Sequence, residues 1–301
     1  MVNFYDKLKK IVSDEGIFKD EPMSKHTSLR IGGPADILII PRSRKELIDV
    51  INIIRSYNMP YLIIGNGTNL LVRDKGIRGV VIKLTALKNI MVDDITIISE
   101  TGALLSAIAN AALSHGLAGF EFASGIPGTI GGAIAMNAGA YGTEIKDVIT
   151  KVEVIDSNGD IHILENGKMA FSYRSSIIQN DNLIAVRAWL RLHKEEYDVI
   201  KKRMNELNNM RKEKQPLEYP SAGSIFKRPH GNYAGKLIQD AGLRGYSIGD
   251  AQVSEKHCGF IINKGNATAE DVLNLIKYIQ NKVKEKFGVQ LVPEVKIVGE
   301  Q

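Results

Sequence analysis

The sequence has a single cysteine, Cys258, among 301 residues. One cysteine excludes an internal disulfide framework and any cysteine-based metal cluster. The six histidines show no HExxH or comparable ligand spacing, so no metal site is expected. This cysteine usage favours the cytoplasm, where structural disulfides are rare.

Long apolar runs are also missing. Stretches such as 37–40 and 61–64 are strand-sized, far below the roughly 20 residues that a membrane-spanning helix requires. Residues 1–16 have the pattern of a charged amphipathic helix and lack the apolar core of a signal peptide. We therefore expect a cytoplasmic protein with no membrane partner.

Basic residues exceed acidic ones, which gives a formal net charge of +5 and a pI near 9.0. The lysines and arginines are spread along the chain, and the densest cluster, 201–214, is interleaved with glutamates in the manner of a solvated helix face. A nucleic-acid partner is not expected. Affinity for a small polyanion remains compatible with this charge.

The usual nucleotide motifs are absent, but two glycine-rich segments take their place. No GxxxxGK[ST] occurs. The turn GNGTN (65–69) is not a Rossmann fingerprint, because Leu70 stands where the third glycine would be and no helix pattern follows. Exposed backbone N–H groups in such a turn can hold phosphate oxygens, although a plain hairpin turn explains the motif equally well when it is taken alone.

The second segment, 124–142, contains six glycines and no charge. Glycine costs more backbone entropy on folding than any other residue, so something close-fitting must compensate. Small residues on all sides allow the backbone to approach a flat or phosphorylated ligand, and we expect this segment to be a loop. Together, the two segments predict a ligand of dinucleotide size.

Several polar residues are candidates for a catalytic or binding site, and each also has a simpler structural explanation. Arg174 lies between two strand patterns, where a surface ion pair is the commoner role. Ser224 follows a glycine but lacks the GxSxG elbow of a hydrolase and a matching triad. Glu294 follows a proline, either at a strand edge or in a site. Gln252 and His257 read equally well as turn caps.

The pattern of helices and strands predicts an α+β protein. Expected helices are an opening one around 4–12, then 44–58, 103–116, 195–214, 233–242 and 268–287. Expected strands are 35–41, 59–67, 79–84, 95–100, 150–156, 161–164, 183–192, 259–264 and 289–298, the last broken by Pro293. Ser43 with Glu46 and Thr268 with Asp271 predict capping boxes.

The sequence resembles the MurB family, the UDP-N-acetylenolpyruvoylglucosamine reductases, in its shorter second class. The shared blocks lie in the family's order over almost the whole chain. They are HTSLRIGGPAD (26–36), GNGTNLLV (65–72), ASGIPGTIGGAIAMNAGAYG (123–142), FSYRSS (171–176), QPLEYPSAGSIFKRP (215–229), AGKLIQDAGLRG (234–245), AQVSEKHCGFIIN (251–263) and PEVKIVG (293–299).

The resemblance implies a fold of the vanillyl-alcohol-oxidase (PCMH) type. An FAD-binding domain would cover 1–200, in lobes of about 1–85 and 86–200, followed by a smaller α+β substrate-binding domain at 201–301. An alternative returns the last strand to the first lobe. FAD is implied as a tightly bound, non-covalent cofactor. The implied FAD contacts are Arg30, Gly33, Gly65, Asn66, Gly67, Thr68, Asn69, Leu70, Gly125, Ile126, Pro127, Gly128, Gly131, Gly132 and Ala133.

The resemblance also implies an activity: NADPH-dependent reduction of UDP-N-acetylglucosamine enolpyruvate to UDP-N-acetylmuramate by a monomer. Arg174 and Glu294 would polarise the enolpyruvyl carboxylate, and Ser224 would be the general acid. The implied substrate contacts are Tyr173, Lys214, Lys227, Gln252 and His257. The alternatives are a flavin oxidase of the same fold and a non-catalytic nucleotide-binding module.

Overall fold

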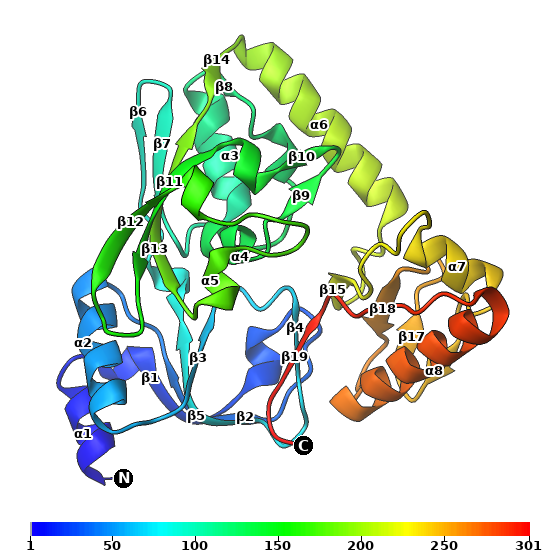
Figure 1. Ribbon diagram of the computed structural model, residues 1–301, viewed down its shortest axis with the longest axis horizontal. Helices are drawn as coiled ribbons and strands as arrows, with labels where there is room; N and C mark the ends of the chain where they lie inside the picture. The colour runs from blue at the N-terminus through cyan, green and yellow to red at the C-terminus, as the bar shows by residue number, and fades with distance from the viewer. Residues whose placement is uncertain (1) are drawn as a thin grey trace. The chain divides into compact units, whose positions relative to one another are not determined.

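The computed structural model describes residues 2–301, which form two compact units (Figure 1). Unit 1 comprises Met1–Phe18, Ile37–Asn66 and Val80–Arg211, and unit 2 comprises Lys19–Asp36, Gly67–Gly79 and Lys212–Gln301. The chain passes between the units inside β1 (Ile17–Pro22), β2 (Pro34–Ile39), β5 (Ile77–Lys83) and α6 (Tyr197–Lys214). The domain limits drawn from the sequence remain a prediction.

The first part of unit 1 contains α1 (Val2–Lys9), α2 (Arg44–Ser56) and β3 (Tyr61–Ile64), which pairs in parallel with β5. A four-stranded sheet runs in the order β1-β2-β5-β3. Ser43 caps α2 by accepting from the Glu46 N–H at 3.1 Å. The Glu46 carboxylate bonds to the Arg42 N–H instead of the Ser43 N–H, so only half of the predicted capping box forms.

The larger part of unit 1 is an antiparallel sheet in the order β12-β11-β13-β7-β6. Residues buried along α3 (Leu105–Ser114) and α4 (Ile130–Ala135) share one hydrophobic core with β11 and β13. The strands are β6 (Ile90–Asp93), β7 (Thr96–Glu100), β11 (Ile149–Ile155), β12 (Ile161–Glu165) and β13 (Ile184–Arg191). Shorter elements are β8 (Leu117–Ala118), β9 (Gly139–Ala140), β10 (Thr143–Glu144), α5 (Ile177–Asn180) and β14 (His193–Lys194).

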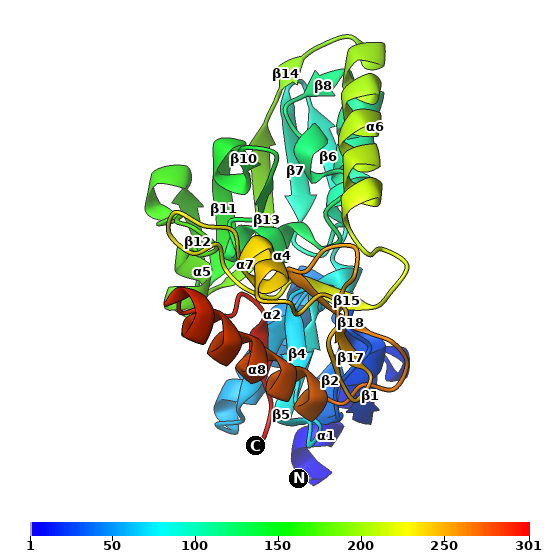
Figure 2. The same ribbon diagram turned by 90° about the vertical axis from the view of Figure 1, so that its right-hand side faces the viewer.

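Helix α6 runs along the edge of unit 1 (Figure 2). Ile200, Met204 and Leu207 follow helical spacing and are buried in the core of that unit. The remaining positions are mostly exposed, as the charge-laced sequence predicts. The helix therefore has a supporting face and a solvated face.

Unit 2 contains a sheet in the order β15-β18-β17-β16, with bounds Ser221–Ser224, Phe260–Asn263, Ala251–Val253 and Ser247–Ile248. Helices α7 (Ala234–Asp240) and α8 (Ala269–Phe287) bury Leu237, Leu275 and Ile279 in its core. The capping box of Thr268 and Asp271 at α8 is confirmed. Strand β19 (Lys296–Val298) pairs in parallel with β4 (Leu70–Val72).

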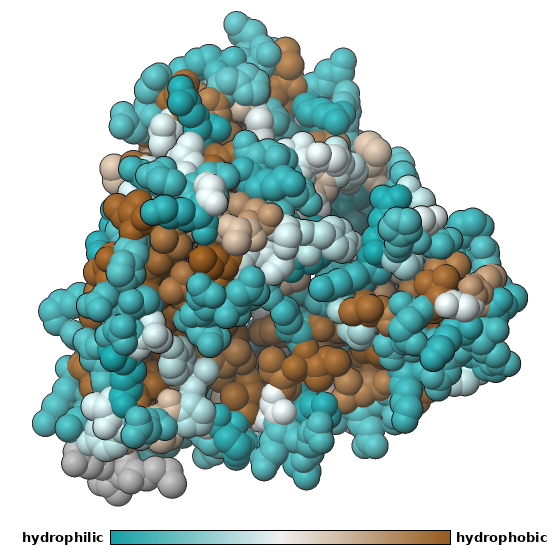
Figure 3. Space-filling view, in the orientation of Figure 1, coloured by the Kyte–Doolittle hydropathy of each residue, from teal (hydrophilic) through white to brown (hydrophobic). Residues whose placement is uncertain are grey.

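Hydrophilic residues cover much of the face shown in Figure 3. Exposed large hydrophobic side chains occur on both edge strands of the five-stranded sheet, at Met91, Ile161 and Ile163. None of the helices within residues 2–301 combines the length and apolar character that a membrane crossing requires.

Candidate functional site

The GNGTN turn follows β3 and leads into β4, with no intervening helix, as expected. A Cβ added at Gly65 would lie 2.4 Å from Thr129 Oγ1, which brings the start of this turn against the second glycine-rich segment. Gly67 has φ +64°, and a Cβ there would lie 2.0 Å from the His26 carbonyl oxygen. Neighbouring protein atoms alone therefore demand glycine at both positions.

The same turn carries unused backbone donors. The N–H groups of Asn66, Gly67 and Thr68 donate to no acceptor in the described part of the chain. Successive free N–H groups in a turn form a concave anion site. Thr68 and Asn69 are half-buried, and the Asn66 side chain is exposed.

The segment 124–142 is not wholly a loop, which corrects the sequence expectation. It contains the short helix α4, capped by Thr129 Oγ1 at 3.4 Å from the Gly132 nitrogen. The Gly131 N–H donates to the Thr101 carbonyl at 2.9 Å, and a Cβ at Gly131 would lie 1.8 Å from Thr101 Oγ1. Small size at Gly131 is therefore dictated by packing within unit 1.

Packing within unit 1 also explains the glycine at position 125, but it does not explain the glycine at position 132. A Cβ at Gly125 would lie 2.5 Å from Asn208 Oδ1 and 3.1 Å from Arg211 Cδ on α6. Gly132 differs, because it is exposed and the nearest atom to its Cβ position, Thr129 Oγ1, is 3.6 Å away. Nothing within unit 1 therefore requires glycine at 132, and its exposed backbone is open to a ligand.

The other predicted FAD residues of this segment divide by burial. Ala133 is buried in the core of unit 1, and the half-buried Ile126 packs against that core. Pro127 is exposed and Gly128 half-buried, with the Gly128 carbonyl accepting from the Leu105 N–H at 3.0 Å. Arg211 is close to Gly125, and burial lowers the pKa of its guanidinium, partly offset by Tyr141.

Arg174 is held in an unusual backbone conformation, with φ +56°. The left-handed region costs a non-glycine residue roughly 1–2 kcal/mol, and such strain is concentrated at functional sites. The Arg174 guanidinium lies 5.3 Å from the ring centre of the exposed Tyr173. Its carbonyl accepts from Gln179 Nε2 at 3.5 Å.

Asn137 anchors the Arg174 loop, and residue-type reasoning missed it. Its side chain is fully buried and donates to the Ser172 carbonyl at 3.1 Å and to Glu144 Oε2 at 3.0 Å. Asn137 is the one amide in the otherwise apolar run 130–140, and that isolated polar residue was the available signal. The glycine-rich segment thereby fixes the loop that carries Arg174.

Ser224 and Glu294 lie on adjoining backbone segments of unit 2. The Glu294 N–H donates to the Ile225 carbonyl at 2.7 Å, and Phe226 forms a bridge with Pro293. Ser224 ends β15, and its Oγ donates to the Phe226 carbonyl at 3.4 Å. The structure therefore brings these two predicted residues together, while Arg174 belongs to unit 1.

His257 and Gln252 accompany Ser224 in unit 2 with different surroundings. A Cβ at Gly259 would lie 2.9 Å from His257 Cε1 and 3.3 Å from Ser224 Oγ, so both side chains flank one glycine. His257 Nδ1 accepts from the Gly259 N–H at 3.0 Å, and burial lowers the pKa of its imidazole. Gln252 donates to the Gly245 carbonyl and to Ser247 Oγ, both at 3.1 Å, which makes it a turn cap.

The remaining predicted residues are spread over unit 2. Arg30 is exposed with φ +56°, and a Cβ at Gly33 would lie 2.0 Å from the Asp74 carbonyl oxygen. Lys214 is the exposed last residue of α6. The Lys227 N–H donates to the Val292 carbonyl at 2.9 Å, which ties Lys227 to the segment before Glu294.

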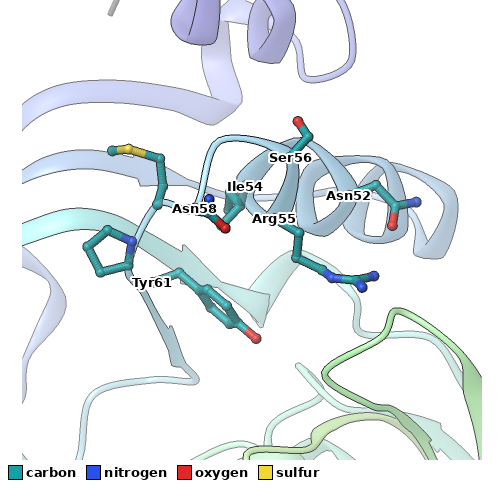
Figure 4. Close-up of a pocket in the computed structure, with 8 residues that line it drawn as sticks. Asn52, Ile54, Arg55, Ser56, Asn58 and Tyr61 are labelled. Atoms are coloured by element: carbon teal, nitrogen blue, oxygen red, sulfur yellow. The ribbon is translucent and has the colours of Figure 1, made fainter.

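Two further features bear on alternative chemistry. Within residues 2–301, no group of three or more histidine, cysteine or acidic side chains is arranged to hold a metal ion. A shallow surface pocket lies where α2 leads into β3, and it includes none of the predicted site residues (Figure 4). Its lining residues are Asn52, Ile54, Arg55, Ser56, Asn58, Met59, Pro60 and Tyr61.

Comparison with known proteins identifies the two parts of the chain. Residues 35–165 match the family model of an FAD binding domain, and residues 215–298 match the C-terminal domain of UDP-N-acetylenolpyruvoylglucosamine reductase. These matches define an FAD-dependent oxidoreductase with an α+β fold.

Curated relatives make the assignment specific. The chain is 64% identical over 296 residues to the UDP-N-acetylenolpyruvoylglucosamine reductase of Caldanaerobacter subterraneus, covering 98% of both chains. It is 55% identical over 299 residues to the enzyme of that name from Clostridium botulinum strain 657, covering 99% of this chain and 98% of the relative. The chain belongs to the UDP-N-acetylenolpyruvoylglucosamine reductase family.

Solved structures agree. The crystal structure of UDP-N-acetylenolpyruvylglucosamine reductase (MurB) from Thermus caldophilus superposes with a TM-score of 0.80 at 36% identity, covering 92% of this chain and 97% of that one. A variant of Phl p 4, a glucose oxidase, shares the fold over 64% of this chain and 44% of its own, at 15% identity and a TM-score of 0.51. The expected family, fold class, oxidoreductase function and FAD cofactor are confirmed.

Proposed function

We propose that the protein reduces UDP-N-acetylglucosamine enolpyruvate to UDP-N-acetylmuramate during peptidoglycan precursor synthesis, with NADPH as the electron source. The observation that carries this proposal is the 64% sequence identity to a reductase of this name over 98% of both chains. The adjoining backbone segments of Ser224 and Glu294 also support it. We further propose that it acts as a monomer in the cytoplasm. In this proposal residues 1–200 form the FAD-binding domain, and residues 201–301 form the substrate-binding domain.

The residues present suit FAD. Its pyrophosphate would use the free N–H groups of Asn66, Gly67 and Thr68 and the exposed backbone at Gly132. When bound, FAD supplies hydride transfer between NADPH and the substrate. Asn69, Leu70, Arg30, Gly33 and the glycine-rich segment 125–133 complete the proposed contacts.

Three side chains would handle the enolpyruvyl group. Hydride addition to the vinyl carbon places negative charge on the neighbouring carbon and the carboxylate, and a guanidinium fork stabilises such charge with two hydrogen bonds. We assign that role to Arg174. Glu294 would donate a hydrogen bond as a neutral acid, because an ionised carboxyl would repel the substrate carboxylate. Ser224 would give the proton that completes the reduced carbon.

The substrate's remaining parts would contact Tyr173, Lys214, Lys227, Gln252 and His257. Lys214 and Lys227 can supply positive charge for the diphosphate. Remote contacts of this kind help to position the reacting vinyl group, so the sugar without UDP is expected to be a poor substrate.

Anaerobic stopped-flow absorbance of the flavin tests the proposal. NADPH should bleach the flavin, and the enolpyruvyl substrate should restore its absorbance, with one NADPH consumed per product. A flavin oxidase of the same fold would instead be reoxidised by oxygen and ignore the substrate. A non-catalytic nucleotide-binding module would bind ligand without any turnover.

A further inference from the structure

The peptide unit of Glu294 is held from both sides in unit 2. Its N–H donates to the Ile225 carbonyl at 2.7 Å, next to Ser224. Its carbonyl accepts from Asn69 Nδ2 at 3.2 Å. The Asn69 carbonyl in turn accepts from the Lys296 N–H at 3.0 Å, where β19 begins its parallel pairing with β4.

Asn69 therefore spans the gap between two strands just where their ladder stops. Leu70 pairs with Lys296, but the residue before each is out of the ladder. The Asn69 side chain replaces the missing backbone bond and fixes the carbonyl of Glu294. Pro293 has no N–H to donate, and the neighbouring contacts of Phe226 with Pro293 and of Lys227 with Val292 lie before Glu294, so Asn69 and Ile225 supply the hydrogen bonds to the Glu294 peptide unit itself.

We propose that the side chain of Asn69 is a positioning residue for Glu294, and that its function is to hold this carboxyl for substrate reduction. The backbone of the GNGTN turn then serves the cofactor while this side chain serves the second half-reaction. This inference rests on the proposed function and deepens it, because it assigns one turn to both cofactor binding and substrate reduction.

Removing the amide donor should loosen Glu294 without unfolding the turn. Misplacing a catalytic group by about 1 Å can lower a rate by roughly 10²-fold. We expect Asn69→Ala to slow reoxidation of reduced flavin by substrate roughly 10- to 100-fold. Reduction by NADPH, flavin content and the apparent affinity for NADPH should stay near wild type, because the FAD contact proposed for Asn69 uses its backbone, which the substitution keeps, and because Glu294 has no part in that step.

Two further variants sharpen the experiment. Asn69→Asp keeps the shape but cannot donate, so it should show the same split between half-reactions even if Asn69→Ala folds poorly. Lys296→Ala is the matched control, because its exposed side chain is lost while its backbone bond to Asn69 remains. That control should behave as wild type in both half-reactions.

A double-mutant cycle separates positioning from general damage. If Asn69 acts through Glu294, Asn69→Ala should add little further slowing in a Glu294→Ala background. Hydrogen exchange of the segment 292–297 gives a readout independent of activity and should become faster in Asn69→Ala holoprotein.

The outcomes are distinct. Loss of flavin from both Asn69 variants, equal slowing of both half-reactions, additive effects in the cycle, or unchanged hydrogen exchange would each overturn the positioning role. A wild-type protein that binds flavin yet never reacts with the enolpyruvyl substrate would instead overturn the proposed function. In that case hydrogen exchange alone would still decide whether Asn69 fixes the Glu294 segment.

Discussion

Gly131 and Gly132 are neighbours in α4, and their surroundings predict opposite effects for the same substitution. A Cβ at Gly131 would lie 1.8 Å from Thr101 Oγ1, and Thr101 is only 3% exposed, so the clash cannot be relieved toward solvent. A Cβ at Gly132 meets nothing closer than 3.6 Å. Gly132→Ala therefore tests the cofactor, and Gly131→Ala tests the packing.

The magnitudes follow from these distances. Overpacking a rigid core costs about 1–3 kcal/mol, and a 1.8 Å clash belongs at the upper end of that range, above the roughly 1 kcal/mol that alanine gains over glycine in a helix. Gly131→Ala should lower the Tm of the flavin-free protein by about 2–4 °C for each kcal/mol lost. Gly132→Ala should leave that Tm unchanged or slightly higher. If FAD lies against this backbone, its affinity should fall at least about tenfold, equivalent to about 1.4 kcal/mol.

Thermal unfolding of the flavin-free proteins and flavin titration of each variant measure the two quantities separately. The proposed cofactor contact at Gly132 is wrong if Gly132→Ala binds FAD as tightly as wild type. The packing argument is wrong if Gly131→Ala is as stable as Gly132→Ala without flavin.

Three other substitutions give further tests. Ser224→Ala should leave flavin reduction by NADPH nearly normal and slow substrate-driven reoxidation by roughly 10²–10⁴-fold, and equal slowing of both steps in stopped flow would make the serine structural. Burial lowers the pKa of His257 from its ordinary value of 6.5, so the unfolded chain takes up a proton as the pH falls through that value and the folded protein does not. The free energy of unfolding should decrease there, and His257→Gln should flatten this decrease in denaturant titrations at several pH values. Arg44→Leu should destabilise the protein by about 1–3 kcal/mol in the same titrations, because the carboxylate of Glu153, which is only 5% exposed, loses the cation that lies 3.3 Å away. An unchanged free energy of unfolding would show that this ion pair is dispensable.

The regular elements could be predicted because their signals are local. Thr268 and Asp271 form the expected capping box, and the alternating strands near 150–156 and 183–192 pair in one sheet. Helix α4 was missed because it has only six residues, two of which are glycines that disfavour a helix, so it is too short for its buried Ile130 and Ile134 to mark an amphipathic period. Its formation depends on Thr129 and Thr101, and the contact with Thr101 joins residues thirty positions apart.

In the candidate site, too, the sequence indicates which residues matter but not which partners hold them. Motifs indicated Arg174, Ser224 and Glu294, but the contacts that hold them come from residues that no motif assigned to that purpose. Asn137 supports the loop of Arg174, and Asn69 reaches the carbonyl of Glu294 across 225 positions of sequence. Such pairings depend on strand order, which local patterns do not determine.

The backbone contacts of unit 2 suit the roles proposed for Ser224 and Glu294. A proton donor and a carboxyl that act on one small group must keep a fixed separation, and a direct backbone bond between their segments is a rigid way to achieve it. The 2.7 Å bond from the Glu294 N–H to Ile225 supplies that link within unit 2. Arg174, proposed to bind the substrate carboxylate, has a long side chain and a backbone φ of +56°, on a loop that Asn137 anchors through the Ser172 carbonyl. In the proposed mechanism, rigidity is thus concentrated where proton transfer would require it, and the long Arg174 side chain would keep the freedom to align its guanidinium with a carboxylate.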